Sequence, residues 1–140
     1  MKDLTDYLIQ NTVGMNYIHT WDIGFGSGQV TELLAKFSGV VIAVEIDAGY
    51  ARPMPGNIIP IIGSVQSLVR AIMPKAISLV HIDVGNNQEA CRYVLQQLKE
   101  KAQVFLLKNY PWLPEMLANN ETPLECIPVG SDYTEVRWMK

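Results

Sequence analysis

Apolar residues recur along the chain in two patterns, which predict strands and helices in alternation. Short, largely apolar runs rich in β-branched residues are typical of parallel strands covered on both faces, and they occupy residues 18–22, 40–44, 58–62, 76–83 and 103–107. Apolar residues at helical spacing predict helices over residues 3–11, 29–37, 65–73, 88–101 and 111–117. Two last runs, 124–129 and 133–139, flank a glycine turn and predict a terminal hairpin. The pattern therefore indicates an α/β fold.

Glycine, proline and polar residues set the expected ends of these elements. Gly39 stands where a helix C-cap favours a residue that tolerates positive φ. Pro60 lacks an N–H group, so its strand should lie at a sheet edge. Ser64 and Asn87 are expected helix N-caps. Pro111 is expected to open the helix over 111–117, because proline is tolerated at the first helical position.

The stretch from Ile18 to Asp47 reads as strand, glycine turn, helix and strand. The turn holds Gly24, Gly26 and Gly28, and Glu45 ends the second strand. Glycines let the backbone approach a ligand closely, and a helix N-terminus offers free N–H groups. A carboxylate at the tip of the second strand can accept two hydrogen bonds from a ribose diol. The stretch therefore predicts a nucleoside-bearing ligand at the carboxyl ends of the strands.

The spacing of the glycines narrows the choice of nucleoside. A dinucleotide fingerprint requires Gly-x-Gly-x-x-Gly, but Gln29 stands at its third glycine position, and no P-loop is present. The pattern is instead Asp22-x-Gly24-x-Gly26-x-Gly28, followed by Glu45 at the end of the next strand. This arrangement resembles motif I and the acidic strand tip of the class I S-adenosylmethionine-dependent methyltransferases.

The resemblance extends over nearly the whole chain and implies a fold. It implies one domain over residues 1–140, with a Rossmann-like seven-stranded, mostly parallel sheet of order 3-2-1-4-5-7-6. Strand 7 would be antiparallel, and helices would cover both faces. A nicotinamide-nucleotide binder is a third reading, which Gln29 and the terminal hairpin disfavour.

The resemblance also implies a cofactor, S-adenosylmethionine, and a set of residues around it. The glycines would hold the methionine moiety, Glu45 the ribose, and the turn at Ser64 and Val65 the adenine. Ser64 stands where relatives often carry an acidic residue for the adenine amino group, so either it serves in that place or it is only a helix cap. The full set of expected cofactor residues is Asp22, Gly24, Phe25, Gly26, Gly28, Glu45, Ile46, Ser64, Val65 and Asp83.

Residues 81–87 and 108–112 are similar to small-molecule O-methyltransferases. The metal-dependent branch of those enzymes uses three oxygen ligands, and Asp83 and Asn109 match two of them. Lys108 replaces the middle ligand, and an ammonium group supplies no lone pair and repels a cation. The resemblance therefore implies metal-independent O-methylation of a small molecule, with Asp83, Lys108 and Asn109 as candidate catalytic residues. A calcium or magnesium titration that showed tight, activity-dependent binding would contradict this.

Four side chains near these motifs each have two possible roles. His81 is either a catalytic group or a buried strand histidine bonded to a neighbour. Lys108 either stabilises an anionic acceptor or extends to solvent. Tyr110 and Trp112 either stack on a planar acceptor or pack beneath the hairpin.

Bulk properties limit the partners and the compartment. The 140 residues carry a net charge of -3, which argues against a non-specific nucleic-acid surface. Two isolated cysteines and the lack of a secretory pattern predict a reduced, cytoplasmic location. No apolar run approaches the roughly 20 residues needed to span a bilayer.

So small a domain would need a dimer mate, a partner protein or a large substrate to complete its acceptor site. The alternative function is therefore a cofactor-binding subunit or scaffold with little activity of its own.

Overall fold

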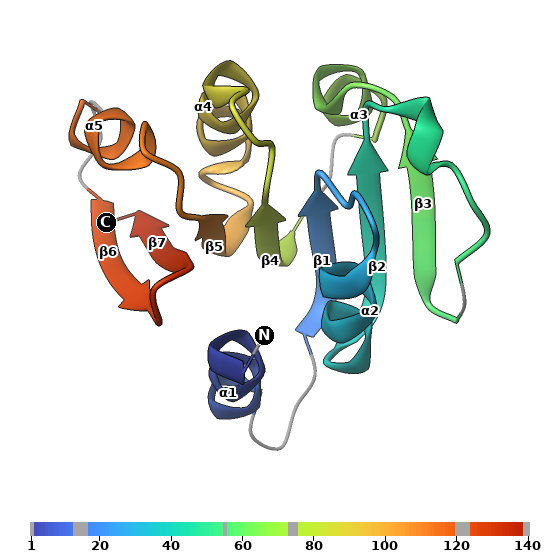
Figure 1. Ribbon diagram of the computed structural model, residues 1–140, viewed down its shortest axis with the longest axis horizontal. Coiled ribbons are helices and arrows are strands. Elements are labelled where there is room, and N and C mark those ends of the chain that lie inside the picture. Colours follow the sequence, from blue (N-terminus) through green and yellow to red (C-terminus); the bar gives the residue numbers. More distant parts are fainter. Residues whose placement is uncertain (1, 13–16, 55, 73–75, 120–123, 139–140) are drawn as a thin grey trace.

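A seven-stranded sheet with helices on both sides forms the structure, a computed structural model that describes residues 2–12, 17–54, 56–72, 76–119 and 124–138 (Figure 1). The strands are β1 (Tyr17–Ile23), β2 (Ser38–Glu45), β3 (Ile58–Ile62), β4 (Ile77–Ile82), β5 (Ala102–Lys108), β6 (Leu124–Val129) and β7 (Tyr133–Trp138). The helices are α1 (Lys2–Asn11), α2 (Gln29–Lys36), α3 (Val65–Ile72), α4 (Gln88–Leu98) and α5 (Leu113–Ala118), with a single 3₁₀ turn, η1 (Ala48–Tyr50).

The order of the strands is β3-β2-β1-β4-β5-β7-β6, as expected. The first five strands in the chain pair in parallel, whereas β7 pairs antiparallel with both β5 and β6. The fold class and the strand order predicted from the sequence are therefore confirmed. The strand order reverses between β1 and β4, and ligands of open α/β sheets bind at such a point.

Two apolar layers bury the faces of the sheet. On one face, α3, α4 and α5 pack against a cluster that includes Trp21, Val80 and Phe105. On the other, α1 and α2 pack against a cluster that includes Leu79 and Leu106. Figure 1 shows α3, α4 and α5 on one side of the sheet, with α1 and α2 on the other. Alternate residues of each central strand therefore point into different layers.

Several local predictions are confirmed. Strand β3 is an edge strand, and Pro60 is exposed on it. Ser64 Oγ accepts the N–H of Ser67 at 3.2 Å, and Asn87 Oδ1 accepts the N–H of Ala90 at 3.1 Å, so both residues cap helices. A cap that the sequence analysis did not predict is Asp47, which accepts the N–H of Gly49 at 2.8 Å at the start of the single turn η1.

The prediction that Gly39 caps helix α2 is wrong. The C-cap is Phe37, and Gly39 lies inside strand β2 without a positive φ. A Cβ at Gly39 would lie 2.8 Å from the carbonyl oxygen of Ile18 on the adjacent strand. Glycine is therefore needed there for the close approach of two strands, a tertiary requirement that local spacing does not reveal.

The prediction that Pro111 opens the last helix is also wrong. The N–H of Leu113 donates to the carbonyl of Tyr110 at 3.0 Å, which closes a turn with Pro111 at its second position, a favoured place for proline. Helix α5 then begins at Leu113, and Pro114 lies in its first turn.

One helix boundary also differs from expectation, and two expected boundaries lie outside the described residues. Helix α4 ends at Leu98 rather than near Lys101, whose carbonyl instead accepts the N–H of Ile77 at 2.8 Å. The expected ends at Met73 and Met139 are outside the described residues. Among the residues that are described, no helix is long and apolar enough to cross a membrane.

Candidate functional site

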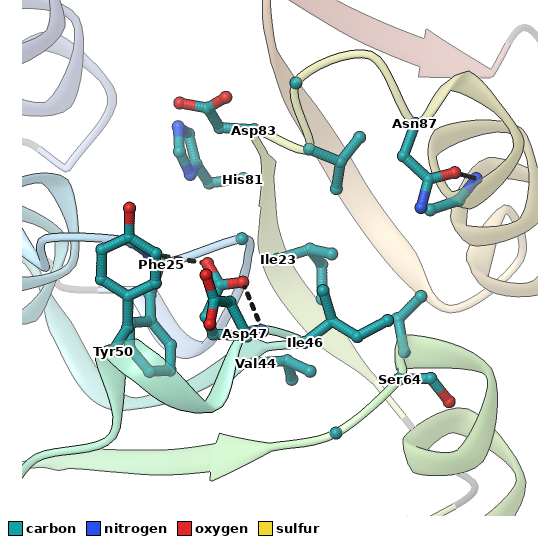
Figure 2. A pocket seen from close by; sticks show the side chains of 18 of the residues that line it. Ile23, Phe25, Val44, Ile46, Asp47, Tyr50, Ser64, His81, Asp83 and Asn87 are labelled. Atoms are coloured by element: carbon teal, nitrogen blue, oxygen red, sulfur yellow. Dashed lines mark hydrogen bonds between the residues drawn. The ribbon is translucent and has the colours of Figure 1, made fainter.

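A pocket of about 540 Å³ opens where the loops after β1, β2, β3 and β4 meet (Figure 2). Because these strands are parallel neighbours, their carboxyl ends lie at one edge of the sheet. The pocket volume falls within the range of about 300–1,000 Å³ typical of small-molecule sites.

The backbone of the loop after β1 contacts the ends of the two neighbouring strands, β2 and β4. The N–H groups of Gly24 and Phe25 donate to the carbonyl of Val44 at 2.8 and 3.3 Å. Gly24 has a φ of +84°, and a Cβ there would overlap the carbonyl oxygen of Asp83. Gly28, with a φ of 85°, is the N-cap of α2. Gly24 and Gly26 therefore place backbone, rather than side chains, at the wall of the pocket.

Glu45 closes this loop at the tip of β2. One carboxylate oxygen accepts the N–H of Gly26 at 3.0 Å, and the other accepts the N–H of Asp47 at 3.0 Å. An ionised carboxylate offers about four lone-pair sites, so each oxygen of Glu45 can accept a further hydrogen bond. Two adjacent hydroxyl groups of a ligand therefore match the free acceptor sites.

Apolar side chains line one end of the pocket next to Glu45. Ile46 is 69% exposed and Tyr50 is 42% exposed, although both are large apolar residues. Ser64, just before α3, and the buried Val65 at its start also line the pocket. A flat, apolar ligand group bound here would cover Ile46 and Tyr50.

Polar side chains gather at the other end of the pocket, at the tip of β4. Asp83 and His81 lie on the same side of this strand, and Figure 2 shows them together at the end away from Ser64. The His81 Nδ1 is 2.7 Å from Oδ1 of Asp22, and the hydroxyl of Thr31 donates to Oδ2 of Asp22 at 2.6 Å.

An aromatic pair supports Asp83 from the loop after β5. The hydroxyl of Tyr110 donates to Oδ1 of Asp83, and its ring stacks on Trp112 with centroids 5.7 Å apart and an interplanar angle of 3°. The indole N–H of Trp112 donates to the carbonyl of Gly85 at 3.1 Å. Burial, and then the hydrogen bond to Asp83, raise the pKa of Tyr110 to about 12. Tyr110 therefore stays a hydrogen-bond donor to Asp83 at neutral pH.

The structure brings most of the expected cofactor residues to one pocket. The loop after β1 and the tip of β2 supply Gly24, Phe25, Gly26, Glu45 and Ile46. The ends of β3 and β4 supply Ser64, Val65 and Asp83.

Asp22 and Gly28 are not among the described residues that line the pocket. Asp22 lies beneath the glycine loop, fully buried and bonded to Thr31 and His81. The guanidinium of Arg52 lies against Gly28 and donates to the carbonyls of Gly26 and Ser27.

Lys108 and Asn109 are also not among the described residues that line the pocket. The Nζ of Lys108 is 3.8 Å from Asp132 and lies over the ring of Tyr133. The side-chain amide of Asn109 makes two hydrogen bonds to the terminal hairpin. Its N–H group donates to the Ser131 carbonyl at 2.9 Å, and its oxygen accepts the Thr134 hydroxyl at 2.6 Å.

Tyr50 lines the pocket, although sequence reasoning gave it no role. It lies in the single turn η1 that follows strand β2, so its place after a parallel strand was the available signal.

Comparison with known proteins identifies the fold. No protein-family model matches the sequence, and the curated proteins also give no match. Solved structures do match over nearly the whole chain. A putative O-methyltransferase from Klebsiella pneumoniae is 16% identical with a TM-score of 0.72, and the match covers 99% of this chain and 79% of that one. A putative methyltransferase from Streptococcus mutans in complex with S-adenosylhomocysteine (SAH) is 10% identical with a TM-score of 0.72, covering 99% and 97%.

An rRNA methylase from Streptococcus thermophilus is 11% identical with a TM-score of 0.67, and the match covers 98% of this chain and 95% of that one. At these identities the likeness establishes the fold, which is that of Rossmann-like methyltransferases. Of the three descriptions, one names an O-methyltransferase, one an rRNA methylase and one a methyltransferase without a stated acceptor, so the likeness shows the fold alone.

Proposed function

We propose that the chain binds S-adenosylmethionine and transfers its methyl group to an oxygen atom of a small molecule. The observation that carries this proposal is the position of Glu45. Its carboxylate is bonded to the glycine loop at the pocket wall and keeps acceptor sites on both oxygens. A ribose diol is the chemical group that those sites match.

The rest of the pocket fits the remaining parts of this cofactor. The backbone cradle of Gly24 and Gly26 leaves room for the methionine moiety next to Asp83. Ile46 and Tyr50 offer apolar surface for the adenine ring, and the turn at Ser64 offers polar groups at its edge. Bound cofactor supplies a methyl group on a sulfonium that is already activated, so the protein contributes positioning and exclusion of water.

The acceptor would bind beyond Asp83, at the end of the pocket away from Ser64. Asp83 is the candidate catalytic residue that lines the pocket, and the Tyr110 hydroxyl fixes its orientation. We include no metal ion in the proposed reaction, because Lys108 takes the place of a ligand.

A second function is favoured by the positions of Lys108 and Asn109. Both side chains are engaged by residues of the terminal hairpin, which leaves Asp83 alone of the three candidate catalytic residues at the pocket. The chain would then bind the cofactor but need a second copy or another protein to complete the acceptor site. Transfer of labelled methyl groups by the chain alone, in a screen of hydroxyl-bearing small molecules, would argue for the first function and against this one.

Calorimetric titration of the full chain with S-adenosylmethionine and SAH tests the cofactor site. The Glu45→Ala variant should weaken binding by about 1–3 kcal/mol, the cost of losing hydrogen bonds to a charged group. Glu125→Ala is the matched control, because it removes the same charge on β6, at the far edge of the sheet from β2 and β3. Equal affinities of Glu45→Ala and Glu125→Ala, or no binding by the wild type, would contradict the proposal.

A further inference from the structure

Arg52 connects the segment after β2 to the glycine loop (residues 24–28). Its Nη1 donates to the carbonyl of Gly26 at 3.3 Å, and its Nη2 donates to the carbonyl of Ser27. The residue is exposed, lies outside the helices and strands, and is 26 and 25 residues from these two partners in the sequence. One side chain therefore holds two consecutive carbonyls of a loop that is distant from it along the chain.

Gly28 provides the space in which the guanidinium of Arg52 lies. A Cβ at Gly28 would overlap Nη2 of Arg52 and would lie 3.5 Å from Cε of Met54. Gly28 is not among the described residues that line the pocket. The last glycine of the loop therefore serves the contact with residues 52–54, on a side of the loop other than the pocket wall.

A role in stability alone accounts poorly for this contact. The ion pairs among the described residues do not include Arg52. Its charge lies against Gly28, the N-cap of α2, and the partial positive charge of a helix N-terminus disfavours a nearby cation. An exposed side chain also gives up water to make its hydrogen bonds, so their net contribution to folding is small.

Gly26 is the residue on which Arg52 and Glu45 both act. Its N–H donates to Glu45 at 3.0 Å, and its carbonyl accepts from Arg52. A Cβ at Gly26 would meet none of the described atoms within 4 Å, so side-chain packing does not hold this residue in place. The position of Gly26 therefore depends on these two hydrogen bonds.

The segment between Glu45 and Arg52 is fixed near both of its ends. Near its start, the N–H of Asp47 donates to Glu45 at 3.0 Å, and at its other end Arg52 is bonded to the glycine loop. Between these anchors, the exposed side chains of Ile46 and Tyr50 line the pocket. Arg52 therefore joins the two parts of the pocket wall that would contact the ribose and the adenine.

We infer that Arg52 is a positioning residue for cofactor binding, which orders the glycine loop and the segment after β2 before the cofactor arrives. The inference rests on the proposed function. Arg52 is not among the described residues that line the pocket, so it acts through Gly26 on the ribose acceptor Glu45. A wall that is ordered beforehand lowers the entropy cost that binding would otherwise bear.

Calorimetric titration with SAH and amide hydrogen exchange of the ligand-free, ¹⁵N-labelled full chain test this role. Arg52→Ala removes both donors, whereas Arg52→Lys keeps the charge but replaces the planar fork with one ammonium group. Arg70→Ala is the matched control, because it removes the same charge from an exposed position in the last turn of α3. Urea denaturation measures the stability of each variant.

Arg52→Ala should weaken SAH binding about tenfold or more, the effect of losing a hydrogen bond to a charged group, and Arg52→Lys should recover part of the loss. In the ligand-free protein, the N–H of Gly26 should lose its protection in Arg52→Ala. The N–H of Gly24, which donates to the carbonyl of Val44 at 2.8 Å, should keep its protection. Stability in urea should change little, and Arg70→Ala should behave as the wild type throughout.

Three results would overturn the inference. They are equal SAH affinities of Arg52→Ala and Arg70→Ala, unchanged protection of Gly26 in Arg52→Ala, and a loss of protection at Gly24 that matches the loss at Gly26. The last result, with a parallel loss of stability in urea, is what a merely structural arginine would give.

The same measurements separate the inference from the proposed function. SAH binding by the wild type that Arg52→Ala leaves unchanged would reject the role of Arg52 and leave the proposed function standing. Absence of SAH binding by the wild type would reject the proposed function itself, and the inference with it.

Discussion

Gly24 lies where the loop after β1 passes close to the backbone at the end of β4. It has a φ of +84°, and a Cβ would overlap the carbonyl oxygen of Asp83. Gly24→Ala should therefore lower the free energy of unfolding by about 2–4 kcal/mol, from backbone strain and overpacking together. The displaced loop should also weaken SAH binding.

Gly63 provides the matched control for this substitution. It also lines the pocket, but a Cβ there would meet no atom within 4 Å, and its φ is not positive. Gly63→Ala should leave stability in urea unchanged or slightly improved, because alanine restricts the unfolded chain more than glycine does. Equal stability of the two variants would show that the close approach of Gly24 to Asp83 does not exclude a side chain at position 24.

Ser64 has two proposed roles, because it caps helix α3 and also lines the pocket where the adenine would bind. Its hydroxyl caps α3, so Ser64→Ala should destabilise the fold by about 0.5–2 kcal/mol. Ser64→Asp keeps a capping oxygen and adds a carboxylate that can accept from an adenine amino group, so it should retain stability and bind SAH more tightly. Urea denaturation and calorimetry separate the two effects. A loss of SAH affinity in Ser64→Asp would place the adenine away from this turn.

Elements whose sequence pattern and tertiary role agree could be predicted from the sequence. The β1–α2–β2 unit is one, because its glycine spacing, its helix and its apolar strand all act within about 30 residues. Gly39 was misassigned for the opposite reason, because a Cβ there would meet the carbonyl of Ile18 on a neighbouring strand, a contact that local spacing does not reveal. Pro111 was misassigned for a local reason. Proline is favoured both at the first position of a helix and at the second position of a turn, and the turn from Tyr110 to Leu113 is what forms.

The same distinction applies to the site. The residues expected at the ends of β1, β2, β3 and β4 do line one pocket, because parallel strands bring their carboxyl ends to one edge. Their contact with a cofactor stays a prediction. Lys108 and Asn109 also lie at the end of a parallel strand, yet the antiparallel β7 pairs with that end of β5. Hairpin atoms then bond to both side chains, a competition that the order of strands alone does not reveal.

Burial in the folded chain opposes the ionisation of several tyrosine hydroxyls and of the buried thiol of Cys91. Burial raises the pKa of Tyr7, and its 2.7 Å hydrogen bond to the buried Glu135 raises it further. Burial is also the largest cause of the raised pKa values of Tyr17 and Tyr133. Tyr110 and Cys91 are raised to about 12. All five groups therefore bind their protons more tightly in the folded chain than in the unfolded one.

This difference predicts a loss of stability at alkaline pH. Below the unfolded pKa values, about 8.5 for cysteine and 10 for tyrosine, the groups are protonated in both states and their contribution is fully present. Above those values the unfolded chain releases protons that the folded chain keeps, so the free energy of unfolding falls as pH rises towards the folded values. The decline should begin near pH 9 and steepen above pH 10, by about 1.4 kcal/mol per pH unit for each proton retained.

Urea denaturation between pH 8 and 11.5 measures how steeply the free energy of unfolding falls with pH. The Tyr7→Phe variant shows how much of that fall comes from the Tyr7 hydroxyl. The variant lacks one retained proton, so above pH 10 its slope should be shallower than that of the wild type by about 1.4 kcal/mol per pH unit. At neutral pH it should be less stable, because Glu135 loses the donated hydroxyl while keeping the guanidinium of Arg137 at 2.7 Å. The two stability curves should therefore converge as pH rises. Parallel curves, or a wild type equally stable at pH 8 and 11, would mean that these hydroxyls reach water more freely than their burial implies.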